Sequence, residues 1–66
     1  MTSIYPIDQY DKDGNLTGIE FLDKITHEFQ FQALWDDREE QTQKNREEFR
    51  KWANNMAKNM GFDVCV

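Results

Sequence analysis

The sequence has one cysteine, Cys65, and one histidine, His27, among its 66 residues. A single thiol excludes an intramolecular disulfide within this sequence, which fits a reducing compartment. A structural zinc site needs three or four nitrogen or sulfur ligands, more than this sequence offers. We therefore expect no metal and no cofactor. We expect Cys65 to act as a small hydrophobic residue, and His27 to be an ordinary, hydrogen-bonded or partly exposed histidine.

Long hydrophobic runs and a basic N-terminal segment are also missing. No stretch approaches the roughly 18–20 apolar residues that cross a bilayer, and the first residues show no signal-peptide pattern. The formal net charge is −5, whereas direct binding to nucleic acid or to an anionic membrane normally requires a basic patch. We expect a cytoplasmic protein that binds neither.

Large aliphatic residues are scarce, but aromatic residues are not. Leu, Ile, Val and Phe account for 14 of the 66 residues, close to the roughly 20% below which a highly charged chain is expected to be disordered. The five Phe, two Trp and two Tyr residues oppose disorder, because each can bury about 150–250 Å². The composition predicts one small domain with an aromatic core and limited stability of its own.

The first half of the chain is typical of strands and turns. Ser3 to Tyr10 is rich in aromatic and β-branched residues and predicts a strand, which lies at a sheet edge because Pro6 has no amide hydrogen to donate. The Asp-Gly pair within Asp11–Asn15 predicts a hairpin turn. Leu16 to Leu22 is the expected returning strand, and Asp23-Lys24 a second short turn. The alternation from Ile25 to Gln32 predicts a third, half-buried strand.

That third strand has one apolar and one polar face. The face expected to be buried carries Ile25, His27, Phe29 and Phe31. The face expected to stay open carries Thr26, Glu28, Gln30 and Gln32.

A long helix is expected from residue 36 to residue 60. Asp36 or Asp37 can cap its start, each with a glutamate three residues later as in a capping box, and Gly61 is a natural residue to follow its end. The apolar stripe near its end consists of Phe49, Trp52, Ala53, Met56 and Met60. The predicted fold is α+β: a three-stranded antiparallel β-meander over residues 1–34, the helix, and a tail over residues 61–66 that forms a short final strand or packs against the sheet.

Residues 36–48 contain no apolar side chain. A helix that is polar all round bridges solvent, is held by a partner, or is not stable alone. We expect this half either to project as a charged ridge, with Asp36, Glu40, Gln43 and Glu47 on one face, or to order only on binding. A solvated face is the ordinary interpretation. The functional alternative is an acidic surface that imitates the phosphates of a nucleic acid in a basic site.

The sequence shows no catalytic pattern. General acid–base catalysis needs carboxylates held in a cleft with their pKa values pushed apart, but the paired carboxylates of this chain fall on a segment that we expect to be exposed. The three glycines are isolated, at positions 14, 18 and 61, so no glycine-rich phosphate loop exists. We expect a protein that is not an enzyme.

The hypothesis that follows is a small acidic interaction protein that binds a basic host protein or nucleoprotein complex. It would inhibit or modulate a nucleic-acid-handling complex such as a polymerase, nuclease or defence system, by analogy of type with short acidic phage and mobile-element inhibitors. The predicted partner-binding residues combine the acids with aromatic residues of the kind that dominate interfaces: Asp36, Asp37, Glu39, Glu40, Glu47, Glu48, Trp35 and Tyr10. The alternative is a self-assembling structural or adaptor subunit, for example a homodimer formed through open strand edges.

Overall fold

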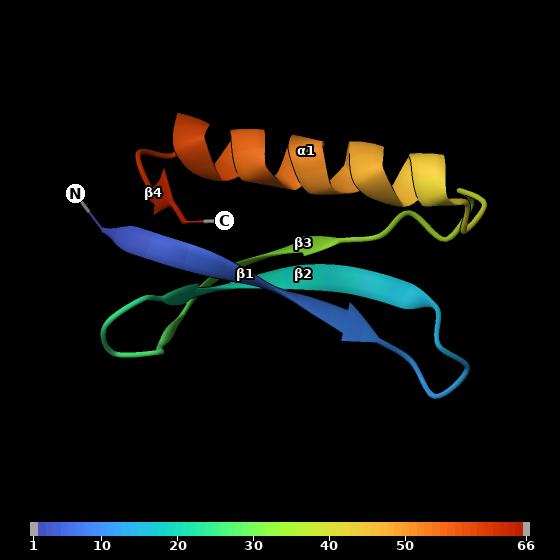
Figure 1. Ribbon diagram of the computed structural model, residues 1–66, viewed down its shortest axis with the longest axis horizontal. Coiled ribbons are helices and arrows are strands. Elements are labelled where there is room, and N and C mark those ends of the chain that lie inside the picture. The colour runs from blue at the N-terminus through green and yellow to red at the C-terminus, as the bar shows by residue number, and fades with distance from the viewer. Residues whose placement is uncertain (1, 66) are drawn as a thin grey trace.

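The computed structural model of the protein describes residues 2–65 and shows the predicted α+β fold. Three antiparallel strands are followed by one helix and a short fourth strand, and the helix lies across one face of the sheet (Figure 1). In chain order the elements are β1 (Ser3–Tyr10), β2 (Leu16–Asp23), β3 (Phe29–Leu34), α1 (Gln43–Asn59) and β4 (Asp63–Val64). Residues 1 and 66, which belong to the expected meander and tail, lie outside the described residues.

The four strands form one sheet in the order β3-β2-β1-β4. The pairs β1–β2 and β2–β3 are antiparallel, as in the predicted meander. The tail does form a strand, and β4 runs parallel to β1 opposite only Ser3 and Ile4. Within residues 2–65 the remainder of β1 has no strand on that side. Pro6 therefore lies at an open stretch of edge, where its missing amide hydrogen costs no ladder bond.

The connection between β1 and β2 is the predicted hairpin turn. One carboxylate oxygen of Asp11 accepts the backbone N–H groups of Asn15 and Asp13, each at 2.9 Å, and these hydrogen bonds lower the pKa of Asp11. Close to this turn, β2 approaches β3 tightly. A Cβ atom on Gly18 would lie 2.6 Å from the carbonyl oxygen of Ala33, so a side chain at this position would force the two strands apart.

The third strand begins later than the predicted Ile25, because a turn follows β2. Oδ1 of Asp23 accepts the N–H groups of Ile25 (2.8 Å) and Thr26 (3.1 Å), and His27 adopts a positive φ of 62°. The side chain of Ile25 is 86% exposed. The prediction of strand structure for residues 25–28 is therefore wrong. The Asp23 carboxylate accepts hydrogen bonds from the backbone N–H groups of Ile25 and Thr26, and this local turn competes with pairing in the sheet.

A register shift between β2 and β3 turns Phe29 away from its expected face. Phe21 lies opposite Phe31, but the next residue of β2, Leu22, lies opposite Phe29 and leaves one β3 residue unpaired. Opposite residues of an antiparallel pair share a face, so Phe29 joins Leu22 on the side away from α1 and is 56% exposed. Tyr5 extends this row, because it lies opposite Leu22 in β1. The open face is thus less polar than predicted.

The helix begins at Gln43, seven residues after the expected start at Asp36. Its N-cap is Thr42, whose hydroxyl accepts the N–H of Asn45 at 3.0 Å. Neither of the two predicted aspartates caps the helix, and the predicted capping boxes do not form. With 17 residues the helix is about 25 Å long, which matches the roughly 27 Å of an eight-residue strand, so no polar half projects beyond the sheet.

The segment between β3 and α1 is a loop tied to the sheet, where the sequence suggested a charged helical ridge. The side-chain amide of Gln41 donates to the carbonyl oxygen of Leu16 (2.9 Å) and accepts the Leu16 N–H (3.1 Å). The guanidinium of Arg46 donates to the carbonyl oxygen of Gln41 at 2.8 Å. Of the expected four-residue face, only Gln43 and Glu47 lie on the helix, and their side chains are hydrogen bonded at 3.2 Å.

The helix ends as predicted, with Gly61 in the left-handed region at a φ of 95°. The N–H of Gly61 donates to the Lys58 carbonyl oxygen (3.0 Å), and the N–H of Phe62 donates to that of Ala57 (3.1 Å). These two bonds are the Schellman arrangement, which needs glycine or asparagine at the position after the cap. They turn the chain back so that β4 reaches β1.

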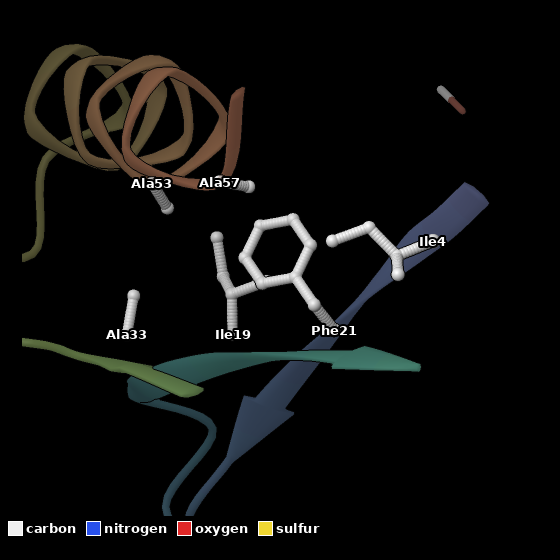
Figure 2. Close-up of a cluster of buried hydrophobic side chains, with 6 residues drawn as sticks. All are labelled: Ile4, Ile19, Phe21, Ala33, Ala53 and Ala57. Atoms are coloured by element: carbon white, nitrogen blue, oxygen red, sulfur yellow. The ribbon is translucent and has the colours of Figure 1, made fainter. Parts of the chain in front are cut away.

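The core lies between the sheet and the second half of α1 (Figure 2). Ala53 and Ala57 are fully buried, and their small side chains let the helix backbone come close to the strands. Trp52, which the predicted apolar stripe of the helix includes, is 51% exposed, so it lies outside the core. The cluster drawn in Figure 2 consists of Ile4, Ile19, Phe21, Ala33, Ala53 and Ala57.

Candidate functional site

A groove of about 440 Å³ lies between the end of β3 and the first half of α1. It is open to solvent and lies next to β3, which is an edge strand of the sheet within the described residues. Its lining comes from the strand end, the following loop and one side of the helix: Leu34, Trp35, Asp36, Glu39, Asn45, Glu48, Phe49 and Trp52.

Three aromatic rings form the wall of this groove. Trp35 and Phe49 meet edge to face with ring centroids 5.1 Å apart, and Phe49 stacks on Trp52 at 5.9 Å. Trp35 is buried, and its indole N–H donates to the carbonyl oxygen of Glu39 at 3.3 Å. Because Trp52 stays half exposed, its ring offers apolar surface to a ligand without disturbing the packing beneath it.

The rim of the groove is acidic. Asp36 is bound by Arg38 through two side-chain hydrogen bonds of 3.1 Å; the side-chain bond from this guanidinium and the Arg38 backbone N–H lower the pKa of the Asp36 carboxyl. The carboxylates of Glu39 and Glu48 make no hydrogen bond or ion pair to any residue between 2 and 65. The groove therefore presents two acidic groups with unused hydrogen-bonding capacity beside an exposed indole.

Four of the eight predicted partner-binding residues meet at the groove: Trp35, Asp36, Glu39 and Glu48. Asp37, Glu40 and Glu47 are exposed but lie outside its lining. Tyr10 lies on β1, separated from β3 by β2, and its hydroxyl donates to Asp8 at 3.1 Å. Asp8 also accepts a hydrogen bond from the guanidinium of Arg50 in α1 at 2.9 Å. Tyr10 thus belongs to a polar cluster between β1 and α1, and the groove lies between β3 and α1.

The sequence did not single out four of the lining residues as part of a site: Leu34, Asn45, Phe49 and Trp52. Phe49 and Trp52 belong to the predicted apolar stripe of the helix; Phe49 packs against the core and also lines the groove, whereas Trp52 is half exposed. The signal that could have set Trp52 apart is the alanine pair at positions 53 and 57. Two alanines four residues apart mark where a helix approaches its support most closely. The neighbouring Trp52, about 100° around the helix from Ala53, must then turn to one side of that contact.

His27 and Cys65 take no part in the groove. Nδ1 of His27 lies 2.8 Å from the Tyr5 hydroxyl, with the rings edge to face. Cys65 is half-buried, and its backbone N–H donates to the carbonyl oxygen of Ile4 at 2.8 Å. Within residues 2–65 no three His, Cys, Asp or Glu side chains come together as a metal site.

No protein-family model matches this chain, and no curated protein or solved structure matches it either. The described part of the chain contains no helix that combines the length and the apolar character of a membrane span. The function is therefore argued from the groove and from the charge of the protein.

Proposed function

We propose that this protein is a non-enzymatic interaction module whose acidic aromatic groove binds a basic partner protein. The observation that carries the proposal is the combination of a half-exposed Trp52 with the unpaired carboxylates of Glu39 and Glu48 in one open groove. Interface hot spots favour tryptophan in a recess, and acidic rims steer and select positively charged partners.

The net charge of −5 supports a positively charged target. Proteins that handle nucleic acids carry basic surfaces that are built to receive phosphates. We extend the proposal to a partner of this kind, which the bound module would inhibit or modulate by occupying or covering the basic surface. Direct binding to nucleic acid is not part of the proposal, because like charges would repel.

The test is an affinity capture from bacterial lysate with the tagged protein and two charge-matched double variants. One variant, Glu39→Lys with Glu48→Lys, reverses the charge of the groove. The control, Asp13→Lys with Glu28→Lys, changes the net charge equally at two exposed positions outside the groove. The proposal predicts that the wild type and the control recover the same basic, nucleic-acid-binding protein, while the groove variant does not.

Salt dependence gives a second criterion in the same experiment. Screening weakens contacts between exposed charges, because the Debye length falls to about 3 Å at 1 M salt. Recovery of the partner should therefore decrease as the salt concentration rises. Equal recovery by both double variants would contradict the proposal.

A second function, self-assembly, is favoured by the apolar row Tyr5, Leu22 and Phe29 on the face of the sheet that α1 leaves open. A second copy stacked on this row would bury the exposed ring of Phe29. A self-assembling protein should show a melting temperature that rises with protein concentration, because association stabilises the folded state by mass action. A melting temperature that is independent of concentration would exclude it.

A further inference from the structure

We propose that the partner segment bound in the groove is an extended, arginine- or lysine-containing peptide that adds as a new strand to the edge of β3. The inference rests on the proposed function and specifies how the partner binds: by backbone pairing with β3, and by a cationic side chain placed on Trp52 next to Glu48.

The edge of β3 carries backbone groups that no other strand uses. The N–H of Trp35 donates to the carbonyl oxygen of Thr17 in β2 at 3.0 Å. Backbone groups point alternately to the two sides of a strand, so Trp35, Ala33 and Phe31 bond toward β2. The N–H and C=O groups of Gln32 and Leu34 then point outward, and β3 is the terminal strand of the sheet.

This edge lacks the features that normally prevent strand pairing. Natural proteins protect edges with lysine, proline, bulges or very short strands. The six residues of β3, FQFQAL, include neither lysine nor proline. The register shift falls next to Phe29, at the opposite end of β3 from the groove, so the stretch from Phe31 to Leu34 is regular.

The free edge and the groove are contiguous. Leu34, the last residue of β3, and the following Trp35 both line the groove. A strand added next to β3 would alternate its side chains between the open face of the sheet and the face under α1. Its helix-side residues would enter the space bounded by Phe49 and Trp52.

The groove selects a cationic side chain. An aromatic face attracts an ammonium or guanidinium group, and tryptophan does so best. Glu48 precedes Trp52 by four residues in α1, so the two side chains lie on the same side of the helix. A guanidinium over the indole ring would reach this carboxylate, which has no partner among residues 2–65.

Charge complementarity favours a basic segment over a second copy of the same chain. Pairing β3 with β3 of another copy would bring together two molecules of charge −5. The two copies would then repel each other, whereas a basic segment would be attracted.

The test uses a synthetic octapeptide of alternating arginine and valine and two N-methylated versions of it. One version is methylated at the valine amides and the other at the arginine amides. In an antiparallel addition with arginine on the helix side, the valine residues lie opposite Gln32 and Leu34, and their amides face β3. Binding is measured by NMR titration of the ¹⁵N-labelled full chain.

The proposal predicts that the unmodified peptide shifts the amide signals of Gln32 and Leu34 and the indole signal of Trp52 in a saturable manner. Methylation of the valine amides should weaken binding at least about tenfold, since each blocked amide removes a hydrogen bond. Methylation of the arginine amides should change the affinity less than about threefold. The reverse pattern, with the shift of the Trp52 indole signal retained, would still support addition to β3, but in the parallel orientation.

Three results would overturn the inference. The first is an equal loss of affinity for the two methylated peptides. The second is that the unmodified peptide causes no shift of the amide signals of Gln32 and Leu34. In either case, the affinity capture still tests the proposed function separately. If Glu39→Lys with Glu48→Lys loses the partner there, the groove binds a basic protein, but not by strand addition to β3. The third is a concentration-dependent shift of these amides without peptide, which would assign the edge to a second copy.

A protein variant tests the same edge independently of the peptide chemistry. Gln32→Pro removes an outward-pointing N–H that makes no bond within the sheet, and edge strands tolerate proline at such positions. The variant should keep its circular dichroism spectrum and lose affinity for the peptide about tenfold. Should Gln32→Pro not fold, the two N-methylated peptides still test the edge, and Trp52→Ala tests the cation site, because it removes the ring on which the cation is placed.

Discussion

The side chain of Gln41 bonds to both backbone polar groups of Leu16, 25 positions away in sequence. The carboxamide donates to the Leu16 carbonyl oxygen at 2.9 Å and accepts the Leu16 N–H at 3.1 Å. Leu16 is buried, so these bonds satisfy groups that water does not reach. They hold the loop before α1 against β2 and so place Asp36 and Glu39 at the mouth of the groove.

Gln41→Ala should lower the free energy of unfolding by about 1–3 kcal/mol, because it leaves a buried donor and a buried acceptor without partners. Urea unfolding followed by circular dichroism measures this change. The matched control is Gln43→Ala, which removes only an exposed hydrogen bond to Glu47 and should cost less than about 0.5 kcal/mol. Equal costs for the two variants would show that Gln41 does not hold the loop.

Thr42→Ala should destabilise the protein by about 1 kcal/mol, because Thr42 caps the helix. Asp37→Ala serves as the control, since Asp37 lies in the preceding loop and not at the helix start. Thermal or urea unfolding compares the two. A larger cost for the Asp37 variant would mean that the helix starts near residue 37, as the sequence alone suggested.

The pKa of Asp23 lies below its ordinary value of 3.8, mainly because the backbone N–H groups of Thr26 and Ile25 donate to its carboxylate. A depressed pKa in the folded state gives stability that is present above pH 3.8 and lost as the pH falls through the folded pKa. An NMR titration of the Asp23 carboxyl should therefore give a midpoint below 3.8. A midpoint at or above 3.8 would contradict the hydrogen-bonded turn.

The Asp23→Asn variant tests the same turn through stability. It keeps an acceptor for the turn but carries no charge, so its melting temperature should decline less steeply than that of the wild type as the pH falls below about 4. Asp37→Asn provides the matched control, because the Asp37 side chain makes no hydrogen bond to residues 2–65.

Trp52→Ala should weaken partner binding strongly while the protein still folds. About half of the indole surface is buried, so its removal should cost about 1–3 kcal/mol of unfolding free energy. Truncation of an interface hot spot costs 2 kcal/mol or more, about thirtyfold in affinity. Ile25→Ala is the control, an equally apolar truncation at an 86% exposed position in a distant turn. Unchanged binding by Trp52→Ala would remove the groove from the interface.

The sequence predicted the fold correctly where local chemistry decides the structure. The Asp-Gly turn, the aromatic and β-branched composition of β1 and the glycine that ends α1 each act within a few residues. The start of β3 was wrong because residues 25–28 alternate like a strand, while Asp23 binds their amides first. A short turn at Asp23-Lys24 was predicted, because aspartate is a turn residue, but its extension as far as Glu28 was not.

The start of α1 and half of the candidate site depend on distant contacts. Residues 36–42 have helix-forming composition, yet the bonds from Gln41 to Leu16 fix them as a loop. No local pattern reveals a partner 25 positions away. The acids of this segment were singled out from the sequence, but only the folded loop shows that Asp36 and Glu39 reach the groove and that Asp37 and Glu40 do not.

The most direct test of the groove as a site for a basic segment is to compare the arginine–valine octapeptide with its citrulline counterpart. Citrulline keeps the shape of arginine without the charge, so Trp fluorescence titrations at low salt isolate the contribution of charge. The account predicts that the arginine peptide binds at least about tenfold more tightly and that Glu48→Gln reduces this difference. Equal affinity of the two peptides would contradict it.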